Sequence, residues 1–318
     1  MENVVLLADK NSNAWGFAEK IKSYLQERYY VSVPLWEVEF EKFRNNEMGA
    51  HVPANIRKKD IYFIHDSSKN PQEWWVELLL LKDLLIRADA KEITFVLPNI
   101  FYSRQDRKHK ARVPISARAV ADSISSGVSR IITMDLHAPQ IQGFYRIPLD
   151  NLYSFPDASR YFKSTNSCCD EIVVVSPDAG GVERARAFAQ KIGSKHPIAF
   201  IQKRRIKIGE VEEMQLTGDV NGKEVLLVDD LIDSGGTLIN AAHLLKEKGA
   251  KSLMCYGAHG LFSGNAIERL SDIFDKIITS DTIPCLRPPN IEVISVAKTF
   301  GEVIYRAQKG YSISQLFE

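Results

Sequence analysis

The sequence predicts an α/β protein with two tandem domains, each a mostly parallel sheet flanked by helices. Short apolar segments alternate with segments of helical periodicity along almost the whole chain, which is typical of parallel sheets covered on both faces. A length of 318 residues with 45% hydrophobic residues suggests about two domains. A weak internal repeat relates residues 59–66 to residues 223–230. The alternative is that any two β-α-β units look alike.

The expected elements follow this alternation in order. In the first half we expect strands at 4–7, 60–64, 93–97 and 130–135, with helices at 13–29, 71–88 and 115–126. In the second half we expect strands at 171–176, 197–202, 224–228, 252–257 and 276–279, and a helix at 238–248. Turn-forming residues cluster at 148–156 and place the boundary between domains 1–152 and 153–302. The C-terminal segment 303–318 is expected to join the first domain.

Composition excludes several functional classes. The chain has 41 Lys and Arg residues and 40 Asp and Glu residues, so its net charge is too small to favour binding to nucleic acid or to membrane surfaces. No apolar run reaches the ~18 residues of a membrane span, and the N-terminus lacks a signal peptide's long apolar core. Four cysteines show neither a disulfide framework nor metal-ligand spacing. We therefore predict a soluble, cytoplasmic protein.

The most informative segment follows the apolar residues 225–228. Asp229 and Asp230 end this strand, and a loop then opens a helix. The loop residues are Asp233, Ser234, Gly235, Gly236 and Thr237. Ligands of open α/β sheets bind at this edge, where glycines and a helix N-terminus let backbone N–H groups hold a phosphate. The carboxylates suit sugar hydroxyls, or a metal ion bound to them. The pattern predicts a sugar-phosphate site, the alternative being an ordinary acidic turn.

Two basic segments suit a polyphosphate. Residues 101–112 follow a strand directly and are rich in Arg and Lys, and residues 203–207 follow another strand. Arginines make bidentate phosphate contacts and lysines act as point charges. A basic arm can also stabilise charge on a transferring phosphoryl group. A solvated basic loop and an RNA-binding patch are the alternatives on charge alone.

Three isolated polar residues complete a possible metal–triphosphate site. Asp135 and His137 follow one strand, and Asp178 follows another, just before Ala-Gly-Gly. Magnesium takes oxygen ligands together with substrate phosphates, so few protein ligands are expected. A histidine in this position is more often a structural hydrogen-bonding residue. The sequence contains no P-loop.

With these segments in place, the chain resembles the ribose-phosphate pyrophosphokinases, or phosphoribosyl pyrophosphate (PRPP) synthetases, and is most similar to their phosphate-regulated class. The matching segments are 104–108, 133–138, 140–144 and 228–230. The resemblance runs from about residue 43 to the end. It implies two type I phosphoribosyltransferase-like domains of which only the second keeps the PRPP loop. In agreement, residues 67–71 of the first half contain no paired glycines.

The resemblance also implies a reaction, in which the C1 hydroxyl of ribose 5-phosphate attacks the β-phosphorus of Mg-ATP to give PRPP and AMP. The implied ATP contacts are Phe43, Asn45, Glu47, Arg104, Gln105, Lys108, His137 and Asp150. The implied ribose 5-phosphate contacts are Asp178, Asp229, Asp230, Asp233, Ser234, Gly235, Gly236 and Thr237. His137 and Asp178 would serve Mg²⁺, and Lys203 and Arg205 would be catalytic. In the family a neighbouring subunit contributes the segment that residues 43–47 match, so the resemblance implies a homo-oligomer from dimer to hexamer.

The chain departs from the family at the regulatory phosphate pocket. Asn55 and Asp89 stand where small hydroxyl residues are expected, although Arg57, Arg112 and residues 312–314 match. A carboxylate would repel phosphate unless it is protonated or paired. Activation by phosphate, inhibition by ADP and the hexamer are therefore open. The alternatives for function are a catalytically silent regulatory subunit and a phosphoribosyltransferase that consumes PRPP.

Overall fold

The computed structural model describes residues 1–165, 169–204, 213–285 and 288–317. The chain forms two compact units. The first domain comprises Met1–Tyr153, Thr282–Pro284 and Val296–Glu318, and the second comprises Ser154–Asp281 and Cys285–Ser295. Within the described ranges, no helix has the length and apolar character needed to cross a membrane.

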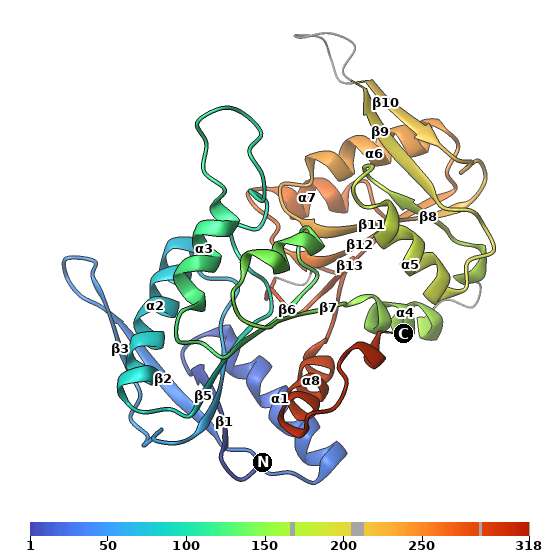
Figure 1. The fold of residues 1–318 in the computed structure, drawn as a ribbon. Coiled ribbons are helices and arrows are strands. Elements are labelled where there is room, and N and C mark those ends of the chain that lie inside the picture. The colour runs from blue at the N-terminus through green and yellow to red at the C-terminus, as the bar shows by residue number, and fades with distance from the viewer. Residues whose placement is uncertain (166–168, 205–212, 286–287, 318) are drawn as a thin grey trace. The chain divides into compact units, whose positions relative to one another are not determined.

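The described part of the first domain contains a seven-stranded sheet in the order β3-β2-β1-β4-β5-β6-β7 (Figure 1). Its strands are β1 (Val4–Asp9), β2 (Leu35–Lys42), β3 (Met48–His51), β4 (Asp60–Ile64), β5 (Glu92–Leu97), β6 (Arg130–Met134) and β7 (Leu149–Leu152). β2 pairs antiparallel with β3, and the other neighbours pair in parallel. The helices are α1 (Asn13–Tyr29), α2 (Pro71–Arg87), α3 (Ser116–Ser125) and α8 (Ala297–Lys309).

The second domain repeats this arrangement. Its described residues form a seven-stranded sheet in the order β10-β9-β8-β11-β12-β13-β14. The strands are β8 (Val173–Ser176), β9 (Ala199–Arg204), β10 (Glu213–Thr217), β11 (Glu224–Ile232), β12 (Ser252–Gly260), β13 (Lys276–Ser280) and β14 (Ile291–Ile294). The helices are α4 (Phe155–Thr165), α5 (Val182–Ile192), α6 (Gly236–Glu247) and α7 (Ala266–Ser271). The order is that of the first domain if β1 is matched with β8 and β4 with β11. The internal repeat therefore relates two copies of one topology.

Helices cover both faces of the first sheet. Trp74 of α2 is fully buried on one face, in a core shared with α3, whereas α1 and α8 cover the other face. Phe17 of α1 packs edge-on against Phe300 of α8 at 5.4 Å between ring centroids. Figure 1 shows these two helices side by side. The C-terminal helix thus completes the first domain.

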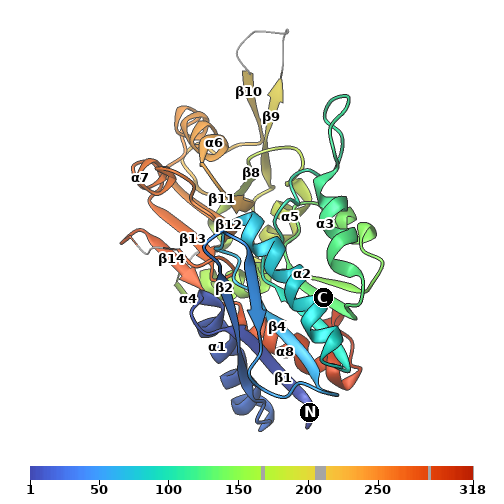
Figure 2. The same ribbon diagram turned by 90° about the vertical axis from the view of Figure 1, so that its left-hand side faces the viewer.

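The predicted fold class is correct, but several elements were not predicted. They are β2, β3, β7, β10, β14, α4, α5, α7 and α8. All five of these strands lie at or next to a sheet edge, where partial exposure weakens the apolar signal. Helix α6 begins at Gly236 rather than at 238, because its first turn belongs to the glycine loop. The antiparallel strands β9 and β10 extend together from their sheet, as Figure 2 shows.

Candidate active site

The loop after β11 carries the residues predicted to bind a sugar phosphate. β11 extends through Asp229 and Asp230, so both carboxylates lie on the strand near its carboxyl end. Gly235 caps α6 with a left-handed backbone, at a φ of 75°. A Cβ at Gly235 would also lie 3.0 Å from Leu270. Glycine therefore sets the path of the loop, which brings it to the N-terminus of α6, where backbone N–H groups and the helix dipole favour an anion.

The two carboxylates are close together and largely buried. The backbone N–H of Asp230 donates to Oδ1 of Asp229 at 2.9 Å. Nη1 of Arg184 lies 3.2 Å from Oδ1 of Asp230 and 3.8 Å from Oδ1 of Asp229. Burial, and secondarily the charge of Asp230, raises the pKa of Asp229, while Arg184 opposes the shift. Arg184 was not predicted. Its sequence signal is a cation in the first turn of the helix that follows Asp178-Ala-Gly-Gly.

Asp178 lies after β8 at the same sheet edge as β11, because the two strands are parallel neighbours. Its Oδ1 accepts the backbone N–H of Gly181 at 2.9 Å, and its side chain is exposed. A Cβ at Gly181 would come within 2.7 Å of Oγ of Ser176. Glycine is thus required for the tight turn that directs Asp178 to the ligand edge.

The predicted catalytic arm is described only in part. Lys203 lies on β9, and its backbone pairs with Met214 of β10. Arg205 lies outside the described residues. The roles of both residues remain predictions.

In the first domain, the basic loop joins β5 to α3. The carbonyl of Gln105 accepts the N–H of Ala117 at 3.3 Å, and its Oε1 accepts the hydroxyl of Ser116 at 2.5 Å. These bonds fix Gln105 to the start of α3. Arg104 and Lys108 are exposed. Their charges can therefore reach a ligand at the carboxyl end of β5.

Two other predicted ATP contacts, His137 and Asp150, lie on or after the last two strands of the first sheet. His137 is exposed and follows β6, whose carboxyl end lies at the same sheet edge as that of β5. Asp150 lies within β7 and pairs with Arg130, the residue that opens β6. Asp150 is thus engaged in an ion pair within its own domain, and its contact with ATP stays a prediction.

The predicted adenine-contacting residues form the turn between β2 and β3. The N–H of Phe43 donates to the carbonyl of Glu47 at 2.8 Å, and Oδ1 of Asn45 accepts the N–H of Glu47 at 3.2 Å. Phe43 is 47% exposed, which is unusual for an aromatic side chain. The turn thus presents an aromatic ring and two polar side chains to solvent.

Comparison with known proteins identifies the family. Residues 5–127 match the N-terminal domain of ribose phosphate pyrophosphokinase, and residues 157–284 match the phosphoribosyl transferase domain. A ribose-phosphate pyrophosphokinase of Campylobacter jejuni is 43% identical over 291 residues, which cover 91% of this chain and 93% of the relative. The chain belongs to the ribose-phosphate pyrophosphokinase family. A Clostridium acetobutylicum relative of the same name is 43% identical over 293 residues, 91% of each chain.

A crystal structure supports this family assignment. The phosphoribosylpyrophosphate synthetase of Mycobacterium smegmatis matches with a TM-score of 0.87 at 33% identity, over 97% of this chain and 99% of that chain. The resemblance and the fold class inferred from sequence are therefore confirmed for both domains.

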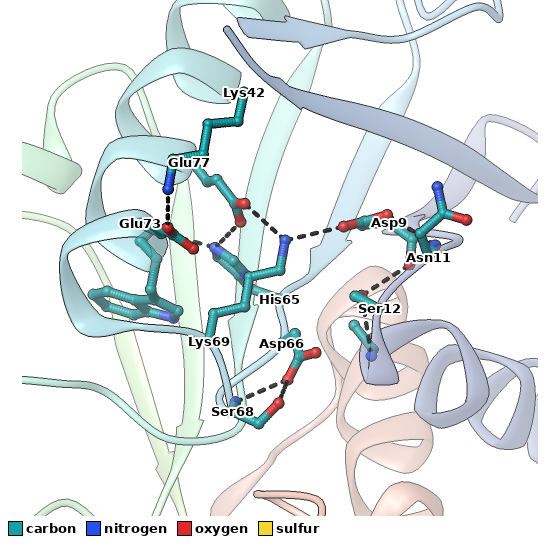
Figure 3. A network of polar contacts seen from close by, with 12 residues as sticks. Asp9, Asn11, Ser12, Lys42, His65, Asp66, Ser68, Lys69, Glu73 and Glu77 are labelled. Atoms are coloured by element: carbon teal, nitrogen blue, oxygen red, sulfur yellow. Dashed lines mark hydrogen bonds and ion pairs between the residues drawn. The ribbon is translucent and has the colours of Figure 1, made fainter. Parts of the chain in front are cut away.

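In this pyrophosphokinase family member, the first domain has a loop at the position of the sugar-phosphate loop, but paired side chains occupy that position (Figure 3). The loop after β4 corresponds to the loop after β11. Nζ of Lys69 lies 2.7 Å from Oε1 of Glu77 and 3.0 Å from Oδ2 of Asp9. Nε2 of His65 lies 3.3 Å from Oε2 of Glu77. We call Asp9, His65, Lys69 and Glu77 the buried network. These side chains occupy the edge where the second domain has its glycine loop.

Burial governs protonation in this network. It raises the pKa of Glu77 to about 7, and Lys69 only partly offsets the shift. Burial also lowers the pKa of His65 to about 3, so this ring is neutral at physiological pH. The neighbouring Asp66 accepts the N–H of Asn13 at 2.9 Å and thereby caps α1.

The residues aligned with the family's regulatory pocket, which include the departures Asn55 and Asp89, are partly paired with one another. Asp89 has a left-handed backbone, and its carboxylate lies 3.1 Å from Nη1 of Arg57 and 2.9 Å from Nζ of Lys58. Hydrogen bonding from Lys58 is the main cause that lowers the pKa of Asp89. Oδ1 of Asn55 accepts the N–H of Arg57 at 3.1 Å. Arg57 and Lys58 thus share one exposed carboxylate, which offsets part of their positive charge.

Proposed function

We propose that this chain synthesises PRPP by transferring the β,γ-diphosphoryl group of ATP to ribose 5-phosphate. The C1 hydroxyl oxygen forms a bond to the β-phosphorus, the bond from that phosphorus to the α,β-bridging oxygen breaks, and AMP leaves. The hydroxyl proton passes to solvent. ATP and ribose 5-phosphate are cytoplasmic metabolites, so we place the activity in the cytoplasm, in the supply of nucleotide biosynthesis.

The loop after β11 is the observation that carries this proposal. Its glycine backbone and the first turn of α6 suit the 5-phosphate, and Asp229 and Asp230 suit the ribose hydroxyls. Asp233, Ser234 and Thr237 add polar groups on the same loop. A loop of this chemistry at the carboxyl end of a parallel strand is what a sugar phosphate needs. The second substrate, ATP, is inferred from the family to which both domains belong.

The residues fit a magnesium ion that arrives with the nucleotide. Asp178 is exposed at the ligand edge and uses one carboxylate oxygen for the turn, which leaves its other oxygen for an ion. No group of three or more His, Cys, Asp or Glu able to hold a metal occurs among the described residues. Asp178 would serve the ion in the second domain, and His137 is the residue of the first domain to which the family resemblance gives the same role; the ion would neutralise phosphate charge when bound.

ATP would be held by residues of the first domain. Arg104 and Lys108 would neutralise its phosphates, Gln105 would hydrogen-bond to it, and His137 would approach it from the next strand. Asp150 is left out of the proposal because it pairs with Arg130. Lys203 and Arg205 would stabilise charge on the diphosphoryl group during transfer, through positioning and electrostatics alone.

The exposed turn between β2 and β3 would contact the adenine ring of ATP bound to a neighbouring subunit. Phe43 offers a surface for stacking, and Asn45 and Glu47 offer hydrogen-bonding groups to the base edge. We propose a homo-oligomer on this basis, from dimer to hexamer, since the ATP site would be incomplete without a second copy.

The test is a direct assay of purified protein with ATP, MgCl₂ and ribose 5-phosphate, with inorganic phosphate added or withheld. Equal amounts of PRPP and AMP would establish the activity. Absence of product from folded protein would instead favour the silent regulatory subunit. Consumption of added PRPP in the presence of a nucleobase would favour a phosphoribosyltransferase.

A further inference from the structure

One cation in the second domain is directed at both carboxylates of the proposed sugar site. Arg184 lies in the first turn of α5, and its side chain is 21% exposed. Its Nη1 lies 3.2 Å from Asp230 and 3.8 Å from Asp229. The side chain of Asp229 is 20% exposed and that of Asp230 10%. This group is therefore a largely buried charge cluster and not a surface ion pair.

The carboxylate pair needs such a partner. Two adjacent carboxylates out of water repel each other, and each loses hydration on burial. This is the physical origin of the raised pKa of Asp229. A guanidinium within hydrogen-bonding distance of one carboxylate and near the other reduces this repulsion. It also fixes the orientation of both carboxylates before any sugar binds.

The first domain shows that the fold does not need this cation. α1 follows β1 as α5 follows β8, and the two domains share one strand order. The residue of α1 that corresponds to Arg184 is Trp15, the third residue of its helix. There, Asp66 corresponds to Asp230 and instead accepts the N–H of Asn13. The arginine thus occurs in the second domain, which has the sugar-phosphate loop, and a tryptophan takes its place in the first domain, which lacks that loop.

We propose that Arg184 is a positioning residue for ribose 5-phosphate, acting by holding Asp229 and Asp230 in the geometry that receives the ribose hydroxyls. The inference rests on the proposed function of that loop. Arg184 acts through the carboxylates and forms no bond to the reacting atoms. Its loss should therefore weaken ribose 5-phosphate binding and leave ATP binding unaffected.

The first experiment compares steady-state kinetics of the wild type with Arg184→Gln and Arg184→Lys. Removing one partner of a buried charge cluster should raise the KM of ribose 5-phosphate by about tenfold or more. The KM of ATP should stay within about twofold, and Arg184→Lys should recover part of the loss because it keeps the charge. Arg186→Gln is the matched control, since Arg186 lies on the same helix and pairs with exposed Glu183.

A double-mutant cycle separates positioning from direct contact. Ribose 5-phosphate binding is measured by calorimetry for Arg184→Gln, Asp230→Asn and the combined variant. If Arg184 acts through Asp230, the combined variant binds no more weakly than Asp230→Asn alone. Multiplying losses, or a fall in kcat at unchanged KM, would overturn the proposal. A wild type that binds ribose 5-phosphate but makes no PRPP would overturn the proposed function alone, because the binding cycle still tests Arg184.

Discussion

The buried network of the first domain predicts an unusual dependence of stability on pH. Glu77 is 2% exposed, and burial raises its pKa from 4.5 to about 7. A carboxyl whose folded pKa is raised binds its proton more tightly when folded. Its stabilising contribution is therefore present at low pH and is lost as pH rises toward the folded value. With these two pKa values, the loss between about pH 5 and about pH 8 is about 2.5 kcal/mol.

The variant Glu77→Gln isolates this effect. Glutamine keeps the shape but cannot ionise, and Lys69 retains Asp9 as a partner at 3.0 Å. Folded His65, with a pKa lowered to about 3, does not titrate in this window, and its titration in the unfolded chain is common to both proteins. The difference in unfolding free energy between variant and wild type should thus move by about 2.5 kcal/mol in favour of the variant from about pH 5 to about pH 8.

Tryptophan fluorescence during urea unfolding is a suitable assay. All four tryptophans, Trp15, Trp36, Trp74 and Trp75, belong to the first domain, so the signal reports the unfolding of that domain. Groups elsewhere titrate equally in both proteins and cancel in the difference. A free-energy difference that is the same at both pH values would refute the reasoning.

Three substitutions test other parts of the molecule. Gly235→Ala places a Cβ on a backbone that is already left-handed and crowds Leu270. The KM of ribose 5-phosphate, measured by PRPP formation, should therefore rise by about tenfold, while the KM of ATP stays similar. Lys203→Ala should lower kcat by about 10²–10³ with little change in ribose 5-phosphate affinity, since it removes one transition-state donor. Asp89→Ser releases Arg57, so PRPP synthesis should become more responsive to added phosphate than in the wild type.

The parts of the site that sequence predicts are those carried by one continuous segment. The loop from Asp229 to Thr237 combines a strand end, glycines and a helix start, so its position at the ligand edge follows from local rules. Arg184 lies far from that loop in sequence, and only the parallel pairing of β8 with β11 brings it to Asp230. Sequence spacing alone does not reveal that contact.

Some missed elements did leave a signal. In β2, Glu37, Glu39 and Glu41 alternate with Val38 and Phe40, which is the period of a half-buried strand. Asp89 shows the opposite case, because the resemblance marked it as a departure from the family but not as a partner of basic side chains. The sign of its effect on phosphate binding depends on that pairing, which only the three-dimensional structure provides.

The two domains share one topology but carry different side chains at the equivalent edge of the sheet. In the second domain, the edge keeps an open glycine backbone, and its carboxylates are balanced by Arg184 from the neighbouring helix. In the first domain, the equivalent edge holds Lys69 between Glu77 and Asp9, and Asp66 is used as a helix cap. A buried cation placed between two carboxylates is costly to move, because either acid would then remain unpaired out of water. The first domain is therefore committed to internal pairing at the position where the second domain has its glycine loop.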